Sequence, residues 1–269
     1  MASARRTGTR MRWGILGAVT LMASMAVAAP ASAAGPQRWV PQPTATFQYQ
    51  LSGTIDVSMP ATVFDLDAQE TPRSVVDRIH ARGRHAICYV DAGTWESYRP
   101  DADRYPAAIL GKRVDGWPDE RWVDIRALAT LKPIIRTRVD RCAAKGFDGV
   151  EYDWMDSYDQ DTGFPITRAD SLRFDRWLAW LAHDRGLSVG LKNSGGLVQA
   201  LVGRFDFAVT EECFQYHECG MYRPFLDAGK AVFDVEYSLG RDQFCDRAHA
   251  LGISAIRKHL SLSAWRRAC

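Results

Sequence analysis

Residues 145–156 read KGFDGVEYDWMD and place four carboxylates in and just after a short apolar segment. They are Asp148, Glu151, Asp153 and Asp156. Acidic side chains gathered at the end of a buried strand destabilise a fold, because like charges repel and burial penalises ionisation. Folds keep such an arrangement where carboxylates do chemistry, such as proton transfer or attack on a sugar or phosphate. We therefore expect this strand to deliver a catalytic carboxylate to an active site.

Charged and polar side chains also follow most of the other predicted strands. In a barrel of parallel strands, these ends meet at one face, where active sites lie. Each residue alone is better explained as a helix cap or a solvated loop charge, but chance would place such charges at both strand ends. The acidic excess predicts a negative potential that favours a cationic or polyhydroxylated ligand. The residues are Asp65, Asp67, Asp91, Asp124, Glu151, Asp153, Lys192, Asn193, Glu211, Glu212, Glu236, Lys258 and His259.

Aromatic side chains occur in the same segments. We expect about half of them to be core residues and others to be exposed beside the carboxylates. Flat rings next to two carboxylates suit glycoside cleavage, in which one carboxyl group protonates the leaving oxygen and the other attacks or activates water. The aromatic residues are Tyr89, Trp95, Tyr98, Trp117, Trp154, Tyr158, Phe214, Tyr216 and Tyr237.

The segments that position these residues alternate between short apolar runs and amphipathic patterns. Such alternation predicts parallel strands joined by right-handed crossovers, here an α/β fold with a single-domain (β/α)8 TIM-like barrel. A doubly wound open sheet is the alternative, but it normally has a Gly-rich loop after its first strand, where this chain has Gly53 alone. The expected strands cover 47–51, 62–66, 85–90, 121–125, 149–152, 187–191, 205–209, 231–235 and 253–256. The expected helices cover 72–82, 127–145, 168–185, 196–204, 222–228 and 241–251.

The N-terminal 34 residues have the layout of a secretory signal peptide. Four arginines precede an apolar run over 13–29, and the small residues PASAA follow at 30–34. A membrane anchor is the alternative, but the run is short for a bilayer, which needs about 20 apolar residues. We expect cleavage after residue 33 or 34, a Pro-rich leader over 35–46 and a barrel domain over 47–269.

Removal of the predicted signal peptide changes the charge balance. It takes away four of the 34 basic residues and no acidic one, so 30 basic and 32 acidic side chains remain, a net charge of −2. This net negative charge argues against a nucleic-acid partner, which a basic surface would attract. No later segment is long and apolar enough to cross a membrane. We expect a secreted monomer that acts on a polysaccharide.

All six cysteines follow the predicted signal peptide. An even number in an exported protein predicts disulfides, although six cysteines allow 15 connectivities. A metal site formed by Cys213, His217 and Cys219 is the alternative, but it offers only three ligands, and thiols outside the cell usually oxidise. We therefore expect no metal. The candidate disulfides are Cys88–Cys142, Cys213–Cys219 and Cys245–Cys269.

Six segments match a known pattern in collinear order, and the similarity extends from about residue 39 to the C-terminus. They are ICYVDAGTWESYRPDADRYP (87–106), LGKRVDGWPDERWVDIR (110–126), KGFDGVEYDWMDSYDQDTGFPIT (145–167), GLSVGLKN (186–193), FDFAVTEECFQYHEC (205–219) and AGKAVFDVEY (228–237). Together they resemble glycoside hydrolase family 114, the endo-α-1,4-polygalactosaminidases and their relatives. The resemblance implies a TIM barrel that cleaves α-1,4-linked galactosamine polymers without a metal or other cofactor.

The resemblance also implies a catalytic pair. Asp153 matches the Asp of the family's G-V-E-P-D-N segment, and Glu211 matches the Glu of its N-E-Q-C segment. Their neighbours depart from that pattern, while Lys192 and Asn193 keep the family's Lys-Asn. The departures are Tyr152 and Trp154 beside Asp153, Thr210 and Glu212 beside Glu211, Asp91 in place of Ser, and Ser194 in place of Asp.

We expect Glu211 to act as general acid/base, its ionisation disfavoured by nearby carboxylates such as Glu212, Asp153 and Glu236, and Asp153 to act as nucleophile. The two roles are interchangeable at this level. Glu151 lies two residues before Asp153 and so on the same side of the strand, either as a supporting residue or as the partner of Lys192 in a buried ion pair. The predicted substrate-binding residues are Asp65, Asp67, Tyr89, Asp91, Trp95, Glu151, Trp154, Lys192, Asn193, Glu236 and Tyr237.

Two other classes of protein remain open. The altered neighbours of Asp153 and Glu211 are compatible with a secreted carbohydrate-binding barrel that has lost turnover. A metal-dependent phosphodiesterase would also use many carboxylates, but it usually has paired histidines near strand ends. Here the six histidines are scattered along the sequence, among them His85, His183, His217, His249 and His259.

Overall fold

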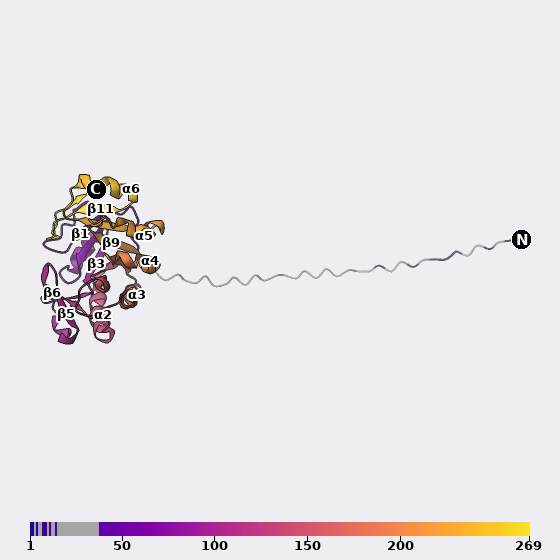
Figure 1. Cartoon of the computed structure of the whole chain (residues 1–269). Coiled ribbons are helices and arrows are strands. Elements are labelled where there is room, and N and C mark those ends of the chain that lie inside the picture. Colours follow the sequence, from indigo (N-terminus) through magenta and orange to yellow (C-terminus); the bar gives the residue numbers. More distant parts are fainter. Residues whose placement is uncertain (3, 5–6, 10, 12–13, 15–37) are drawn as a thin grey trace. The chain divides into compact units, whose positions relative to one another are not determined.

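Eight short apolar segments form parallel strands that pair into one curled sheet (Figure 1). The computed structural model describes residues 38–269 and positions 1, 2, 4, 7–9, 11 and 14. Apart from those few positions, the predicted signal peptide (1–34) and the first part of the leader (35–37) lie outside the described residues. In chain order, which is also their order in the sheet, the strands are β1 (Phe47–Gln50), β2 (Val63–Asp67), β3 (His85–Asp91), β7 (Gly149–Asp153), β8 (Ser188–Lys192), β9 (Phe207–Glu211), β10 (Val232–Glu236) and β11 (Ser254–Arg257).

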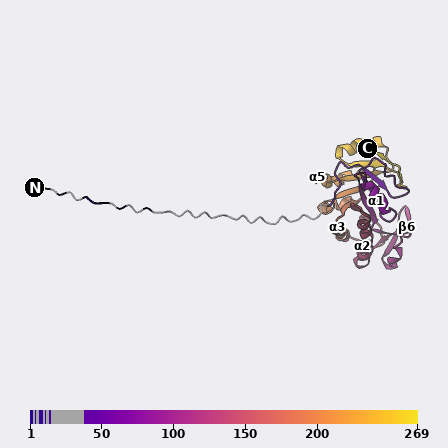
Figure 2. The same cartoon turned by 180° about the vertical axis from the view of Figure 1, so that it is seen from behind.

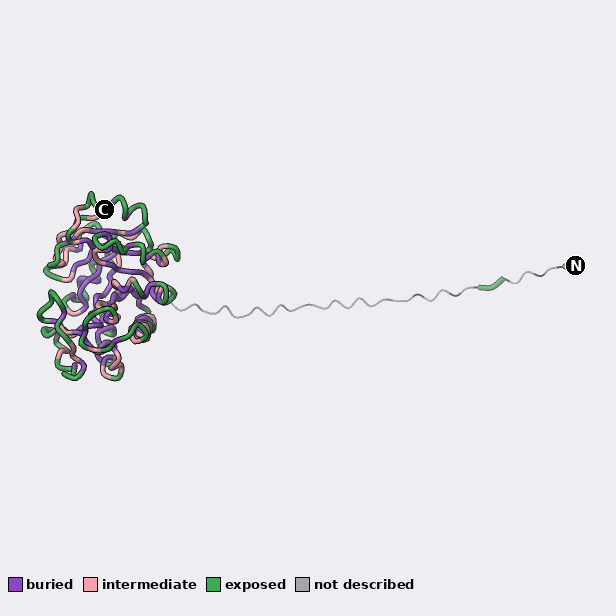
Figure 3. The backbone as a smooth tube through the Cα atoms, in the orientation of Figure 1, coloured by how far each residue is buried: buried purple, intermediate pink, exposed green. Residues whose placement is uncertain are grey.

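The strands are apolar on both faces because both faces are covered. One set of side chains packs inside the curled sheet, where the rings of Phe47 on β1 and Phe233 on β10 stack with centroids 4.5 Å apart. The alternate set, which includes Phe64 and Val150, packs against the helices. Figure 3 shows buried backbone through the middle of the domain and exposed backbone in the outer loops. The predicted α/β, TIM-like architecture is thus confirmed.

Helices cover the outer face of the sheet, as Figures 1 and 2 show from opposite sides. A capping box begins α3 at Thr167, whose side chain accepts from the Asp170 N–H. Within 38–269, no helix follows β1 or β11, and no helix is long and apolar enough to cross a membrane. The α-helices are α1 (Arg73–His80), α2 (Leu128–Lys145), α3 (Arg168–Asp184), α4 (Val198–Leu201), α5 (Arg223–Asp227) and α6 (Arg241–Leu251), and the 3-10 helices are η1 (Ala102–Arg104), η2 (Ala107–Ile109), η3 (Ser157–Asp159), η4 (Gly195–Leu197) and η5 (Cys219–Tyr222).

The sheet closes at a seam between β1 and β11, which lie side by side. The described residues include no backbone ladder between these strands. Residues 258–264 bridge them instead. The N–H groups of Leu51 and Ser52 donate to the Leu262 carbonyl at 3.0 and 3.2 Å, and Gln48 Nε2 donates to the Ala264 carbonyl at 3.0 Å. A short strand, β12 (Arg267–Ala268), then pairs antiparallel with β11.

A small antiparallel sheet interrupts the barrel between β3 and α2. It has the order β4 (Thr94–Glu96), β6 (Trp117–Val123) and β5 (Leu110–Val114). The prediction of a barrel strand at 121–125 was therefore wrong, because the alternating pattern of this segment is the same for either kind of sheet. Asp124 consequently lies away from the barrel mouth, where its Oδ1 accepts from Arg126 Nε at 2.8 Å.

Three disulfides join the three predicted pairs of cysteines. Cys88–Cys142 links β3 to α2, and Cys213–Cys219 closes the loop after β9. Cys245–Cys269 ties α6 to the last residue of the chain. With Cys213 and Cys219 bonded to each other, they are not thiolate ligands, which removes the alternative of a metal site with His217.

Candidate active site

The carboxyl ends of the parallel strands open into a cavity of about 1140 Å³, including its open mouth. This is the face at which barrel active sites lie. Six lining side chains are acidic and one, Arg99, is basic. The lining residues are Tyr49, Leu51, Ser52, Asp67, Tyr89, Glu96, Tyr98, Arg99, Trp117, Glu120, Asp153, Trp154, Asn193, Glu211, Glu212, Tyr237, Leu260, Ser261 and Leu262.

Lys192, the last residue of β8, lies under this cavity and is only 1% exposed. Its Nζ is 3.1 Å from Glu151 Oε1, 3.1 Å from Asp153 Oδ1 and 3.4 Å from Glu211 Oε2. It also donates to the hydroxyl of Tyr49 at 2.9 Å. Burial by itself lowers the pKa of Lys192, but the three carboxylates outweigh it and hold the pKa well above its usual value. Lys192 is therefore a buried ammonium ion that joins three neighbouring strands.

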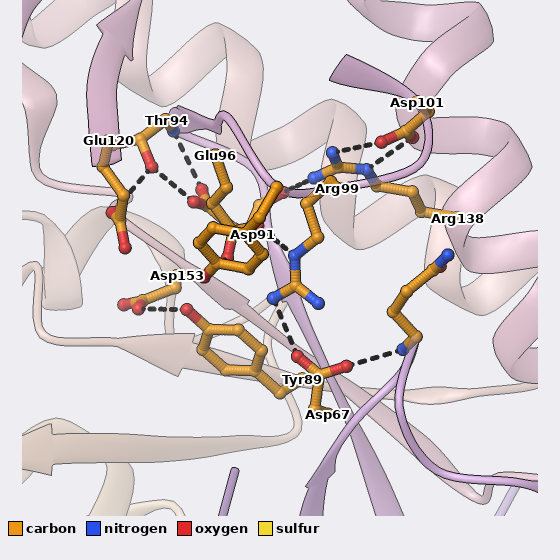
Figure 4. Close-up of polar contacts among 12 residues, drawn as sticks. Asp67, Tyr89, Asp91, Thr94, Glu96, Arg99, Asp101, Glu120, Arg138 and Asp153 are labelled. Atoms are coloured by element: carbon orange, nitrogen blue, oxygen red, sulfur yellow. Dashed lines mark hydrogen bonds and ion pairs between the residues drawn. The ribbon is translucent and has the colours of Figure 1, made fainter. Parts of the chain in front are cut away.

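Asp153 ends β7 and is held by donors on both carboxylate oxygens. Tyr89 Oη donates to Oδ2 at 2.8 Å, and the Trp154 N–H donates to Oδ1 at 3.0 Å, beside Lys192 (Figure 4 shows the Tyr89 contact). Trp154 has a φ of 58°. The backbone here is so close to β3 that a Cβ on Gly93 would lie 1.9 Å from the Trp154 carbonyl oxygen. The side chain of Asp153 is 15% exposed, at the floor of the cavity.

Glu211 ends β9 and is positioned by Asn193. The Asn193 amide donates to Glu211 Oε2 at 3.2 Å, and its oxygen accepts from the Glu211 N–H at 3.0 Å. Asn193 itself has a φ of 50°, in the left-handed region that Asn tolerates better than most residues. The hydroxyl of Tyr237 donates to Glu211 Oε1. Glu211 is 25% exposed, more than Asp153.

The two carboxylates lie close together because they share Lys192. Asp153 Oδ1 and Glu211 Oε2 are 3.1 and 3.4 Å from the same Nζ atom, so these oxygens are at most 6.5 Å apart, the sum of the two distances. Retaining glycosidases have carboxyl groups about 5–5.5 Å apart and inverting ones about 6.5–9.5 Å. Both carboxyl groups are thus close enough to act on one glycosidic bond, and the bound is compatible with either geometry.

Two of the predicted residues form a deeper layer of the barrel interior. Glu151 is fully buried and makes the ion pair with Lys192 that the sequence left as one of two alternatives. Burial raises the pKa of Glu151 to about 8, although Lys192 opposes the shift. Asp65 is also fully buried, and burial followed by repulsion from Glu151 raises its pKa well above the usual value. Neither residue lines the cavity.

Residues of the β4–β6 sheet build one side of the cavity (Figure 4). Arg99 joins two acids there, with contacts of 2.7 Å to Asp67 Oδ2 and 2.6 Å to Glu96 Oε2. Glu120 lies opposite Glu96 across the β4–β6 pairing. Trp154 Nε1 donates to Glu120 Oε2 at 3.1 Å. Asp67 thus lines the cavity as predicted, but its charge is already balanced by Arg99.

Besides Asp65, Glu151 and Lys192, three more predicted substrate-binding residues lie outside the cavity lining. Asp91 is buried and accepts from the Thr94 N–H at 2.8 Å. Trp95 donates from Nε1 to the Ala102 carbonyl at 3.0 Å and packs against the helix-side core. Glu236 precedes Tyr237, and strand alternation turns it to the outer face, where Oε1 accepts from the Phe214 N–H at 2.8 Å.

Four residues in or beside this group were not among the predicted site residues: Tyr49, Glu96, Arg99 and Glu120. Tyr49 alternates with Phe47 on β1, so strand periodicity could have indicated that it faces the interior. The others come from the β4–β6 sheet, whose fold over the barrel mouth has no local sequence signal.

The sequence matches a model of the glycoside-hydrolase family GH114 over residues 28–269. Ega3 from Aspergillus fumigatus, solved in complex with galactosamine, is 34% identical and superposes with a TM-score of 0.83. That match covers 88% of this chain and 100% of the Ega3 chain.

Two more distant similarities extend this comparison. The glycoside hydrolase domain of PelA from Pseudomonas aeruginosa is 15% identical, with a TM-score of 0.69 over 82% of this chain and 97% of that domain, which indicates a shared fold. An uncharacterized protein of Deinococcus radiodurans is 30% identical over 207 residues. That match spans 65% of this chain and 63% of the Deinococcus protein, less than two thirds of its length.

A Lys192→Met variant tests the buried ammonium ion. Its loss leaves Glu151 and Asp153 buried without a counter-ion, so we expect the free energy of unfolding to fall by about 3–5 kcal/mol, measured by urea denaturation. Lys112→Met is the matched control, because Lys112 also pairs with an acid, Asp161, but both side chains are more than half exposed, at 57% and 81%. We expect a loss below about 1 kcal/mol there. Equal losses in the two variants would contradict the interpretation.

Glu120 gives stability a defined pH dependence. Burial, together with repulsion from Glu96 and Asp153, raises its pKa from 4.5 to about 7. Between these pH values the folded protein binds a proton that the unfolded chain has released, so the free energy of unfolding falls as the pH rises. The Glu120→Gln variant has no titratable group at this position. Wild-type stability minus variant stability should therefore decrease across the window, by at most about 1.4 kcal/mol per pH unit. Urea unfolding at both ends of the window measures it, and a difference that is flat or rises with pH counts against the shift.

Proposed function

The chain belongs to glycoside-hydrolase family GH114, and from this we propose that it is a secreted enzyme that hydrolyses α-1,4-linked galactosamine-containing polysaccharide, using Asp153 and Glu211 and no metal. The observation that carries the proposal is the carboxylate pair on Lys192 at the floor of the cavity. Its two members come from β7 and β9, with Lys192 on the strand between them. The similarity to Ega3, solved with galactosamine, supports the choice of sugar.

In the proposed mechanism Asp153 is the nucleophile. It accepts from Tyr89, the Trp154 N–H and Lys192, and three donors stabilise the ionised form that must attack. Asp153 attacks the anomeric carbon as the bond to the leaving oxygen breaks. The result is a glycosyl–enzyme ester.

Glu211 is the proposed acid/base. It is the more exposed of the pair and lies farther from Lys192, at 3.4 Å rather than 3.1 Å, so protonation costs it less attraction. Its carboxyl group protonates the leaving oxygen in the first step. In the second step the resulting carboxylate takes a proton from water, which attacks the ester and releases the sugar and Asp153. Asn193 and Tyr237 hold Glu211 through both steps.

The charge of the cavity suits the proposed substrate. Galactosamine residues are cationic near neutral pH, and the lining has six acidic side chains against one basic one. A negative cleft concentrates a cationic polymer at its mouth. The exposed rings of Tyr98 and Trp117, 61% and 44% exposed, provide flat surfaces beside the reacting pair.

Neither altered neighbour of Asp153 removes a contact of its carboxylate. Tyr152 is fully buried on the helix side of the sheet, and its hydroxyl donates to the Leu178 carbonyl at 3.3 Å. Trp154 supplies a donor to Asp153. The experiment below distinguishes catalysis from the alternative function, a barrel that binds carbohydrate without turnover.

Asp153→Asn and Glu211→Gln test the proposal. Each removes a group that bonds or transfers a proton in the transition state, so we expect kcat to fall on the order of 10²–10⁴-fold for Glu211→Gln and at least as far for Asp153→Asn. Release of reducing ends from polygalactosamine is the measurement, and Glu218→Gln, the same change at an exposed position, is the control. Wild-type protein that binds this polymer but releases no reducing ends at any pH would instead favour the binding barrel.

The proposed role of Asp153 as nucleophile predicts retention of configuration. Two inversions at the anomeric carbon return the α configuration, so the α-anomer should be the first product. Proton NMR during the first minutes of digestion, before mutarotation, distinguishes the anomers. Initial release of the β-anomer would show that water attacks directly and that Asp153 is not the nucleophile.

A further inference from the structure

We propose that Glu120 binds the ammonium group of the sugar held beside Asp153 and thereby selects free galactosamine over its N-acetylated form. This rests on the proposed function, because it assigns a specificity residue to the same cavity. A general preference for cations would involve the whole cavity, whereas this role involves one carboxylate and one group of the substrate.

Four of the six acidic side chains in the cavity lining already have a basic partner. Asp67 and Glu96 share Arg99, with contacts of 2.7 and 2.6 Å. Asp153 and Glu211 share Lys192, with contacts of 3.1 and 3.4 Å. Among residues 38–269, no basic nitrogen lies within 4.0 Å of either remaining acid, Glu120 or Glu212.

Glu120 and Glu212 differ in how they are placed. Glu212 is half-buried, with a φ of 53°, and its Oε1 accepts from Ser238 Oγ at 3.0 Å. Glu120 is only 7% exposed, yet it lines the cavity. A carboxylate removed from water to this extent, without a counter-ion, is unfavourable unless something compensates it. Glu120 is therefore the stronger candidate for a ligand's positive charge.

The surroundings of Glu120 fix one oxygen and leave the other free. Trp154 Nε1 donates to Oε2 at 3.1 Å, and Thr94 Oγ1 lies at the same distance from that atom. Within the described part of the chain, Oε1 has no hydrogen-bond partner. The indole of Trp154 is held in turn by edge-on packing against Trp122, with centroids 5.1 Å apart. Glu120 thus presents one preoriented acceptor to the cavity, close to Asp153 (Figure 4).

The charges around Glu120 indicate that a ligand of this residue would be positively charged. Glu120 stands directly opposite Glu96 in the β4–β6 pairing, a like-charge arrangement that destabilises a sheet. Burial together with Glu96 and Asp153 raises the pKa of Glu120 to about 7. A cation at Oε1 would relieve both effects. A neutral N-acetyl group would leave the carboxylate unpaired, which is the kind of mismatch that produces strong discrimination.

Glu120→Gln is the direct test, since it keeps the size of the side chain and removes its charge. The substrates are polygalactosamine with free amines and the same polymer after chemical N-acetylation. We expect kcat/KM on the free-amine polymer to fall on the order of 10- to 100-fold, with little change on the acetylated polymer. The preference for the free amine should therefore collapse. Equal losses on both polymers, or an unchanged preference, would overturn the proposal.

Three further variants separate specificity from structure. Trp154→Phe removes the donor to Oε2 but keeps the charge, so the preference should persist even where the rate falls. Glu212→Gln tests the other unpaired acid, and loss of preference there in place of Glu120→Gln would overturn the assignment. Glu218→Gln, at an exposed position outside the lining, should behave as wild type on both polymers.

Binding measurements keep this test independent of turnover. Isothermal titration of the Glu211→Gln protein with galactosamine oligosaccharides, free or N-acetylated, reports the preference without any cleavage. If wild type cleaves neither polymer, the proposed function fails, while a preference for free amines in this titration that Glu120→Gln removes still supports the role of Glu120. If the titration shows no preference, the role of Glu120 is wrong even for an active hydrolase.

Discussion

The site depends on one buried ammonium ion surrounded by more negative charge than it can neutralise. Three carboxylates meet Lys192 Nζ within 3.4 Å in a part of the barrel interior that water barely reaches. Protonation of a carboxyl group reduces this excess of negative charge. Burial raises the pKa of Glu151 to about 8, so a proton on Glu151 offsets part of this excess as the pH falls below that value. In the proposed mechanism a proton on Glu211 offsets a further part and leaves Lys192 facing the ionised Asp153.

The barrel and the inserted sheet divide the work of the cavity. Barrel strands supply the proposed reacting pair and Lys192, whose positions are fixed by the parallel pairing of β7, β8 and β9. The β4–β6 sheet supplies Glu96 and Glu120, together with the contact to Trp154. Under the proposed function, the reaction therefore depends on barrel strands, and recognition of the amino group depends on an inserted sheet.

The sequence was most informative where function and local pattern coincide. Acidic residues at the end of an apolar run singled out Asp153, and the family pattern added Glu211. The three disulfide pairs were also predicted. The predictions were wrong where one local sequence pattern is compatible with two structures. The alternation at 121–125 suits a barrel strand or an antiparallel strand. Because this segment was assigned to the barrel, Glu120 was not predicted as a site residue. Only tertiary folding brings Glu120 close to Asp153.

Strand parity explains why Glu236 lies outside the cavity. Glu236 and Tyr237 are adjacent in sequence, but one faces the helix side and the other contacts Glu211. A prediction made from strand ends alone cannot choose between such neighbours, because it lacks the register of the sheet. Asp153 and Glu151 were placed correctly relative to each other because they are two residues apart on one strand.

The seam between β1 and β11 joins the closure of the barrel to the wall of the cavity. Residues 260–262 line the cavity, and the same segment supplies the Leu262 carbonyl that closes the barrel. It is held at its far end by the antiparallel pairing of β11 with β12 and by the disulfide from Cys269 to α6. A change in this segment would therefore alter the shape of the cavity and the closure of the sheet together.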